Sequence, residues 1–107
     1  MSLNAKLYLV PTAVLALLFS LPARADTNTI TIKNFNFAPM QISIGAGTTI
    51  TWHNADEEPH TVTSDSGAFR SGAIDGGATY SFKFAKPGTY KYLCSIHPQM
   101  MGTIIVK

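Results

Sequence analysis

Residues 79–94 read TYSFKFAKPGTYKYLC, which is two alternating runs separated by a turn at residues 86–88. One face of the two runs carries five aromatic residues and a cysteine: Tyr80, Phe82, Phe84, Tyr90, Tyr92 and Cys94. Alternation of apolar and polar residues is typical of a β-strand with one buried face. This stretch therefore predicts two strands, each presenting an aromatic face to a core.

The same alternation recurs through most of residues 29–107, with Gly, Pro, Asn and Asp between the runs. Besides the two strands above, it predicts strands at residues 29–33, 42–44, 48–54, 60–63 and 103–107. Phe35 and Phe37 continue the alternation of the first of these, whereas residues 64–77 hold four glycines and predict a loop. About seven or eight short strands at this spacing indicate an all-β, two-sheet sandwich.

The first 25 residues have a different composition from the rest of the chain. Lys6 is followed by an apolar stretch from Leu7 to Leu21, and small residues stand at Ala23 and Ala25. This order is typical of a secretory signal peptide. The stretch is shorter than the ~20 residues that span a bilayer, which disfavours the alternative of an uncleaved anchor. We expect cleavage after Ala25, export to the periplasm, and one mature domain at residues 26–107.

The mature domain has no excess of either charge. The full chain has eight Lys and Arg residues against six Asp and Glu residues, but Lys6 and Arg24 belong to the leader. Residues 26–107 therefore have equal numbers of basic and acidic residues. This disfavours nucleic-acid binding, because that needs a basic surface. We expect no membrane contact after cleavage and a monomer.

Residues 94–100 read CSIHPQM and place a thiolate, an imidazole and a thioether at the end of a predicted strand. A second imidazole, His60, lies upstream after Pro59. Two imidazoles, one thiolate and a weak thioether are the ligand set of a blue, or type 1, copper site. The sequence therefore predicts that one copper ion, cycling between Cu(I) and Cu(II), is held by His60, Cys94, His97 and Met100.

Simpler explanations exist for each of these residues taken singly. A lone cysteine is more often a small buried apolar side chain, and methionines often fill a core. Zinc would accept Cys and two His, but a structural zinc site prefers a fourth Cys or His and a catalytic one keeps a water. Met101 could replace Met100 as the axial ligand. With four protein ligands no position stays open for a substrate, which favours electron transfer over catalysis.

Other polar residues near these motifs have less specific interpretations. If Trp52 faces the core, His53 faces away from it and is more simply a surface residue. The acidic run at residues 56–58 could be a docking patch, but a solvated loop is the simpler interpretation.

The chain resembles the cupredoxins, within the pseudoazurin–plastocyanin family and most closely its amicyanin-like branch, over nearly all of residues 29–107. The resemblance rests on four stretches: TWHN at residues 51–54, PHTV at 59–62, PGTY at 87–90 and CSIHPQM at 94–100. In amicyanin the ligand loop is similarly short, with two residues between the second His and the Met. Plastocyanins and pseudoazurins have longer loops there, which favours Met100 over Met101.

The resemblance implies a Greek-key β-sandwich with copper near one end and an exposed edge of His97 as the electron port. A hydrophobic patch around that edge would include Pro59 and Pro98. It also implies redox partner proteins, such as an amine dehydrogenase as donor and a cytochrome c or an oxidase as acceptor. The chain departs from the family at Thr61, where many members have Asn, and at Ile96, where amicyanin typically has Pro. The Thr61 hydroxyl could bond across the loops in place of Asn, and its amide could donate to the Cys94 sulfur.

Together these observations predict a periplasmic type 1 copper protein that carries one electron between redox partners and is not an enzyme. The alternative is a periplasmic copper-binding protein for copper delivery or resistance, which would use the same residues. An enzyme of the copper oxidase or nitrite reductase kind would need further copper centres, and only His53 remains unassigned. A structural sandwich without metal is the remaining alternative.

Overall fold

The computed structural model describes residues 27–107, and the predicted signal peptide at residues 1–25 lies outside them. Within this range the chain forms eight strands and no helix. The strands are β1 (Thr27–Lys33), β2 (Asn36–Ala38), β3 (Gln41–Ile44), β4 (Thr48–Asn54), β5 (Thr63–Ser64), β6 (Thr79–Phe84), β7 (Gly88–Leu93) and β8 (Met101–Val106). The all-β class predicted from the alternation is confirmed. No helix long and apolar enough to cross a membrane occurs in the described part of the chain.

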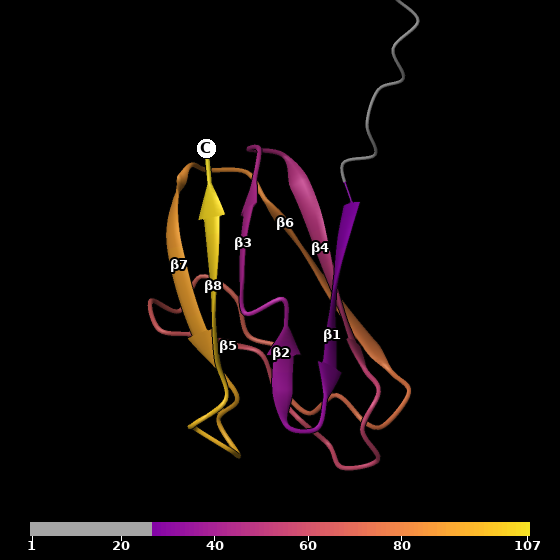
Figure 1. Ribbon diagram of the computed structural model, residues 1–107. Helices are drawn as coiled ribbons and strands as arrows, with labels where there is room; N and C mark the ends of the chain where they lie inside the picture. Colours follow the sequence, from indigo (N-terminus) through magenta and orange to yellow (C-terminus); the bar gives the residue numbers. More distant parts are fainter. Residues whose placement is uncertain (1–26) are drawn as a thin grey trace, which may run out of the picture.

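The strands form two four-stranded sheets that face each other (Figure 1). One sheet has the order β2-β1-β4-β6 and the other β3-β8-β7-β5. Strands β1 and β4 pair in parallel, as do β3 and β8, so the chain crosses between sheets in a Greek-key arrangement. The turn after β6 is one of these crossings, since β6 pairs with β4 whereas β7 pairs with β8 and β5. The two aromatic runs therefore meet across the core, where Phe84 and Tyr90 lie with ring centroids 5.2 Å apart.

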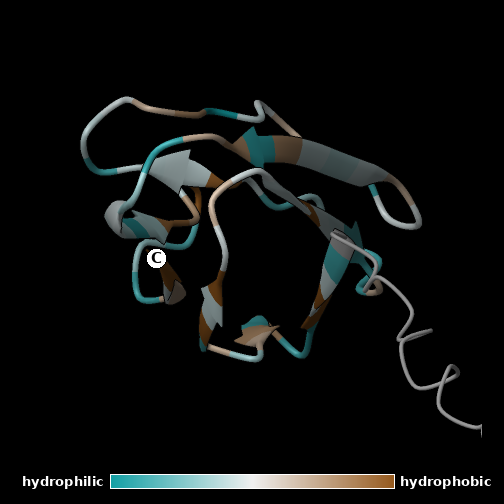
Figure 2. Ribbon diagram, turned by 90° about the horizontal axis from the view of Figure 1, so that it is seen from above, coloured by the Kyte–Doolittle hydropathy of each residue, from teal (hydrophilic) through white to brown (hydrophobic). Residues whose placement is uncertain are grey.

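The core lies between the two sheets, and β4 shows how the sequence builds it. Alternate residues of β4 are buried, which places Ile50 and Trp52 inside. Trp52 contacts Phe69 and Tyr92, at centroid distances of 5.8 and 5.5 Å. Figure 2 shows the same alternation as brown and paler segments along the strands. Each fully buried side chain of Ile or Phe size stabilises such a fold by about 1.5–3 kcal/mol.

The alternation is misleading at one position, Phe35. Strand β1 ends at Lys33, and the chain reverses in a two-residue turn before β2 runs back antiparallel to β1. Asn34 and Phe35 form this turn with positive φ angles of 53° and 60°. Phe37 is buried as expected, whereas Phe35 stays 37% exposed at the tip of the turn.

Residues 64–77 contain little strand, as their composition predicts. The strand expected at residues 60–63 is shorter, since β5 covers only Thr63–Ser64, and His60 forms an isolated bridge with Ile74. Phe69 and Ile74 from this segment are buried in the core. The segment therefore closes one side of the sandwich although it has no clear periodicity.

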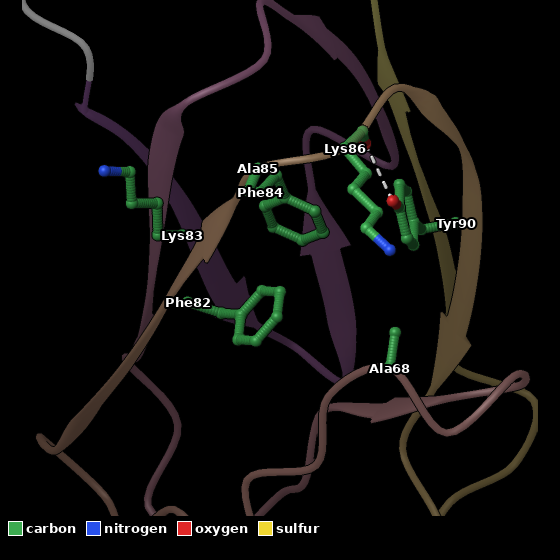
Figure 3. A pocket seen from close by; sticks show the side chains of 7 residues that line it. All are labelled: Ala68, Phe82, Lys83, Phe84, Ala85, Lys86 and Tyr90. Carbon is green, nitrogen blue, oxygen red and sulfur yellow. Dashed lines mark hydrogen bonds between the residues drawn. The ribbon is translucent and has the colours of Figure 1, made fainter.

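A hollow of about 230 Å³ lies at the β6–β7 turn (Figure 3). Its lining is mostly apolar and includes Phe82, Phe84 and Tyr90, with the Tyr90 hydroxyl donating to the Lys86 carbonyl over 2.7 Å. This turn precedes β7, whereas the predicted ligand loop follows β7. The hollow therefore belongs to the opposite end of the sandwich from the predicted metal ligands.

Gly102 of β8 tests how closely the side chain of Tyr92 packs over its cross-strand partner in the same sheet. A Cβ at this position would overlap the ring and hydroxyl of Tyr92, which is itself buried. We expect Gly102→Ala to lower the free energy of unfolding by about 1–3 kcal/mol, because the overpacked core must shift. Urea denaturation measures this loss. Gly45→Ala is the matched control, since a Cβ there meets nothing within 4 Å, and an equal effect of the two changes would contradict the packing argument.

Candidate metal centre

The loops that carry the predicted ligands, after β4 and after β7, lie at the same end of the sandwich, at the bottom of Figure 1. The loop after β4 brings in His60, and Cys94 directly follows the last residue of β7. The short loop from Cys94 to Met100 then leads into β8. The antiparallel pairing of β7 with β8, which sets Leu93 opposite Met101, holds the two ends of this loop side by side.

His60, Cys94 and His97 form a compact cluster of potential metal ligands. One ligand atom from each lies within 4.8 Å of the others. The Cys94 sulfur is 3.9 Å from His60 Nδ1 and 3.7 Å from His97 Nδ1. His60 and Cys94 are fully buried, whereas His97 is only partly so. Both imidazoles therefore present the same ring nitrogen to one buried thiol.

Met100 and Met101 have opposite surroundings. Met100 is 2% exposed and packs in the core, whereas Met101 is 60% exposed. The ligand loop is closed by three backbone hydrogen bonds, in which His97 donates to Cys94, Met100 to His97, and Cys94 to Met100. These bonds hold the Met100 backbone next to Cys94 and His97, and together with its burial this favours Met100 over Met101 as the axial ligand.

Asp56 has a role that the sequence does not reveal, because an acidic run usually forms a solvated loop. Its carboxylate lies 2.9 Å from His60 Nε2 and accepts hydrogen bonds from the amides of Asn34 and Phe35. Burial alone would raise the pKa of Asp56, but the two amides and His60 outweigh it and hold the pKa below the usual 3.8. A carboxylate on the outer nitrogen orients an imidazole and leaves Nδ1 free for a metal.

Phe35 is the second residue at the site that the sequence does not reveal. From the turn between β1 and β2 its ring lies against the imidazoles of both His60 and His97. Only an interruption of the alternation at Asn34 could have indicated that Phe35 leaves the strand.

Comparison with known proteins places the chain in a family. The family model of the cupredoxin-like domain matches residues 8–106. This chain is a cupredoxin. Amicyanin-alpha from Methylorubrum extorquens is 36% identical to it over 90 residues, which cover 79% of this chain and 76% of the relative.

Solved structures agree with this fold. The purple cupredoxin from Nitrosopumilus maritimus superposes with a TM-score of 0.69 at 31% identity, covering 75% of this chain and 99% of that one. An amicyanin variant in its Cu(I) form gives 0.73 at 26% identity, covering 82% and 88%. A copper-containing nitrite reductase from Thermus scotoductus also gives 0.71 at 30% identity, but the match covers only 22% of that longer chain, against 76% of this one.

In this cupredoxin Thr61 joins the two ligand-bearing loops, as expected if a hydroxyl replaces the family's Asn. The Thr61 amide donates to the Cys94 sulfur over 3.2 Å. The Ser95 amide donates to the Thr61 hydroxyl over 2.7 Å, and the two hydroxyls lie 3.0 Å apart. Both bonds that the sequence suggested for Thr61 are therefore present.

The surroundings of Cys94 favour a thiolate. Burial alone would raise the pKa of the thiol, but the Thr61 amide, His60, His97 and the Ile96 amide outweigh it and lower the pKa to about 6. A thiolate is the form of cysteine that binds a metal. One thiolate, two imidazoles and a nearby buried thioether fit copper, whereas zinc would favour a further Cys, His or water.

The remaining residues considered in the sequence analysis are not members of this cluster. His53 projects from the face of β4 opposite Trp52, in agreement with its interpretation as a residue outside the core. Glu57 and Glu58 are exposed, so of the acidic run only Asp56 contributes to the site. Pro59 and Pro98 are exposed beside His60 and His97, where the family resemblance places a surface patch.

Proposed function

We propose that this cupredoxin is a periplasmic one-electron carrier whose single copper ion is held by His60, Cys94, His97 and Met100. The observation that carries the proposal is the convergence of two imidazole nitrogens on one thiol within 4.8 Å. This donor set suits both oxidation states of copper, because thiolate favours Cu(I) and imidazole also suits Cu(II). Cleavage after Ala25 would release the mature domain into the periplasm.

Copper, when bound, supplies the Cu(I)/Cu(II) couple, and the protein supplies a fixed set of ligands. Asp56 holds the His60 ring, and Thr61 holds the Cys94 sulfur and the start of the ligand loop. Because these bonds fix the His60 ring and the Cys94 sulfur, little has to move when the charge of the metal changes. Such preorganisation suits a carrier that must exchange electrons with several proteins.

The route for the electron runs through His97, the ligand whose ring is partly exposed. Apolar residues adjoin His97, namely Phe35, whose ring packs against it, and Ile96, which is 51% exposed. We infer that a redox partner docks on this end, with an amine dehydrogenase as a candidate donor and a cytochrome c or an oxidase as acceptor. The equal numbers of basic and acidic residues in residues 26–107 leave no net positive charge to attract nucleic acid, and we expect a monomer without membrane contact.

An enzymatic role is less well supported than electron transfer. The four proposed ligands fill the coordination of a type 1 site and leave no position for a substrate. The sequence contains three histidines, and after His60 and His97 only His53 remains for a further copper centre. Copper delivery would use the same four ligands, and it differs by predicting ready release of copper to an acceptor.

The visible spectrum of the mature protein tests the proposed function. After Cu(II) is added we expect an intense band near the red end of the spectrum, bleached by ascorbate and restored by an oxidant. That band reports a Cys–Cu(II) bond in a type 1 site. A colourless protein, or a weak copper band only, would contradict the proposal and favour Cu(I) storage or delivery.

The choice of Met100 as the axial ligand gives a second test. We expect Met100→Leu to keep copper but to raise the reduction potential by about 59 mV or more, which is tenfold in the equilibrium constant of a one-electron couple. The reason is that the weak axial sulfur donates to Cu(II) and tunes the potential. Protein-film voltammetry measures the shift. Met101→Leu is the control, and a larger shift there would mean that Met101 is the axial ligand.

A further inference from the structure

We propose that Phe35 is a positioning residue that covers the two imidazoles of the copper site and keeps external ligands away from the metal. This inference rests on the copper function proposed above. Phe35 is a large apolar residue at the tip of a turn, yet its ring packs on two of the proposed metal ligands. None of the four proposed ligand positions includes it.

The backbone of Phe35 is in an unusual conformation for its residue type. The β1–β2 hairpin has two loop residues, Asn34 and Phe35, and both have positive φ. Such two-residue turns strongly prefer Asn followed by Gly, because a Cβ is unfavourable at positive φ. Asn34 meets this preference and Phe35 does not. A bulky residue held in the left-handed region often marks a functional site.

The Phe35 ring stands edge-on to both imidazoles. Its centroid lies 4.9 Å from that of His60 with an interplanar angle of 88°, and 4.8 Å from that of His97 with an angle of 86°. The two imidazoles are themselves 5.1 Å apart. These are favourable distances and angles for edge-to-face aromatic pairs. The three rings therefore form one cluster, with Phe35 as the member that holds no metal-binding atom.

The Asp56 carboxylate binds both the turn that carries Phe35 and the imidazole of His60. One carboxylate oxygen accepts from the Asn34 amide over 2.7 Å, and the other accepts from the Phe35 amide over 2.9 Å. The second oxygen also lies 2.9 Å from His60 Nε2. The position of the Phe35 ring is thereby tied to the position of the His60 ring. A shift of the turn would change the cover of the site and the orientation of His60 together.

The burial pattern shows what the ring protects. Phe35 is 37% exposed, whereas His60 and Cys94 behind it are fully buried. The imidazoles that Phe35 contacts are the ones that flank the Cys94 sulfur at 3.9 and 3.7 Å. Removing the ring would therefore uncover both imidazoles and open a path to the thiol between them. A small anion could then reach a metal held by these groups.

Two substitutions remove the ring without straining the turn, namely Phe35→Gly and Phe35→Asn. Both residues accept positive φ, so we expect a thermal midpoint equal to or above that of the parent. The first readout uses copper-free protein and the rate at which Cys94 reacts with a disulfide reagent. We expect this rate to rise roughly tenfold or more in both variants, because thiol reactivity follows exposure.

The second readout uses the Cu(II) protein titrated with azide. We expect the visible band of the parent to be insensitive to azide and that of both variants to change. Phe35→Leu should give a thiol rate and an azide response close to those of the parent, since the Leu side chain also provides apolar cover. Met40→Ala is the matched control, because Met40 is an exposed apolar residue outside the aromatic cluster, and it should leave both readouts unchanged.

Parent-like thiol rates and azide response in Phe35→Gly and Phe35→Asn would overturn the proposal. So would an equal change in Met40→Ala, since that would show that truncating any exposed apolar side chain has the same effect. If the parent forms no type 1 band, the proposed electron-carrier function fails. The thiol rates of copper-free protein would then still decide whether Phe35 covers the cluster.

Discussion

Replacing Cys94 by alanine is expected to abolish the intense visible band completely. The band requires a Cys–Cu(II) bond, and Cys94 is the single cysteine of the chain. The loss also removes the soft ligand on which the two imidazoles converge, so Cu(I) should bind far more weakly. The fold should survive, because Cys94 is a small side chain whose removal leaves only a small cavity. Absorption of the Cu(II)-loaded protein and a chelator competition for Cu(I) measure the two effects.

The control for this experiment is Ser95→Ala, which leaves the thiol in place. The Ser95 hydroxyl contacts the Thr61 hydroxyl, and that contact is lost in the variant. The hydrogen bond from the Ser95 backbone amide to the Thr61 hydroxyl survives the change. We expect its band to keep most of its intensity. An intact band in Cys94→Ala would show that the thiol is not a copper ligand and would refute the assignment of the site.

Replacing Asp56 by alanine is expected to weaken copper binding by about 10–100-fold, the usual cost of losing a partner that orients a metal ligand. The carboxylate holds His60 Nε2 and the amides of Asn34 and Phe35 at once. Without it the His60 ring can rotate, and the turn that carries Phe35 loses its anchor. Competition with a chelator of known affinity measures the change in copper affinity.

Glu57→Gln is the matched control, because it removes a charge from the same loop at an exposed side chain. Copper affinity within twofold of the parent is expected there. If Asp56→Ala and Glu57→Gln weakened binding equally, the effect would come from the charge of the loop. The hydrogen bond to His60 would then make no contribution to copper affinity.

The fold class and the candidate ligands could be read from the sequence because both depend on local patterns. Alternation along a strand, as at residues 79–84, records which face is buried wherever the strand lies in the sheet. Cys94, His97 and Met100 share one loop, so their spacing alone brings them together. His60 could be added because an imidazole is the donor that the set lacked. The role of Thr61 was also accessible, since it adjoins a proposed ligand.

The tertiary structure alone decided what surrounds the site. Asp56 belongs to a run of three acidic residues, and nothing in that run distinguishes its carboxylate, which is 7% exposed, from the exposed ones. Its partners are the amides of a turn more than twenty residues earlier in the chain. Phe35 continued an alternating pattern, yet the reversal at Asn34 carried it out of the strand and onto the two imidazoles. Such contacts depend on how β1, β2 and the loop after β4 pack together, and local periodicity holds no information about that packing.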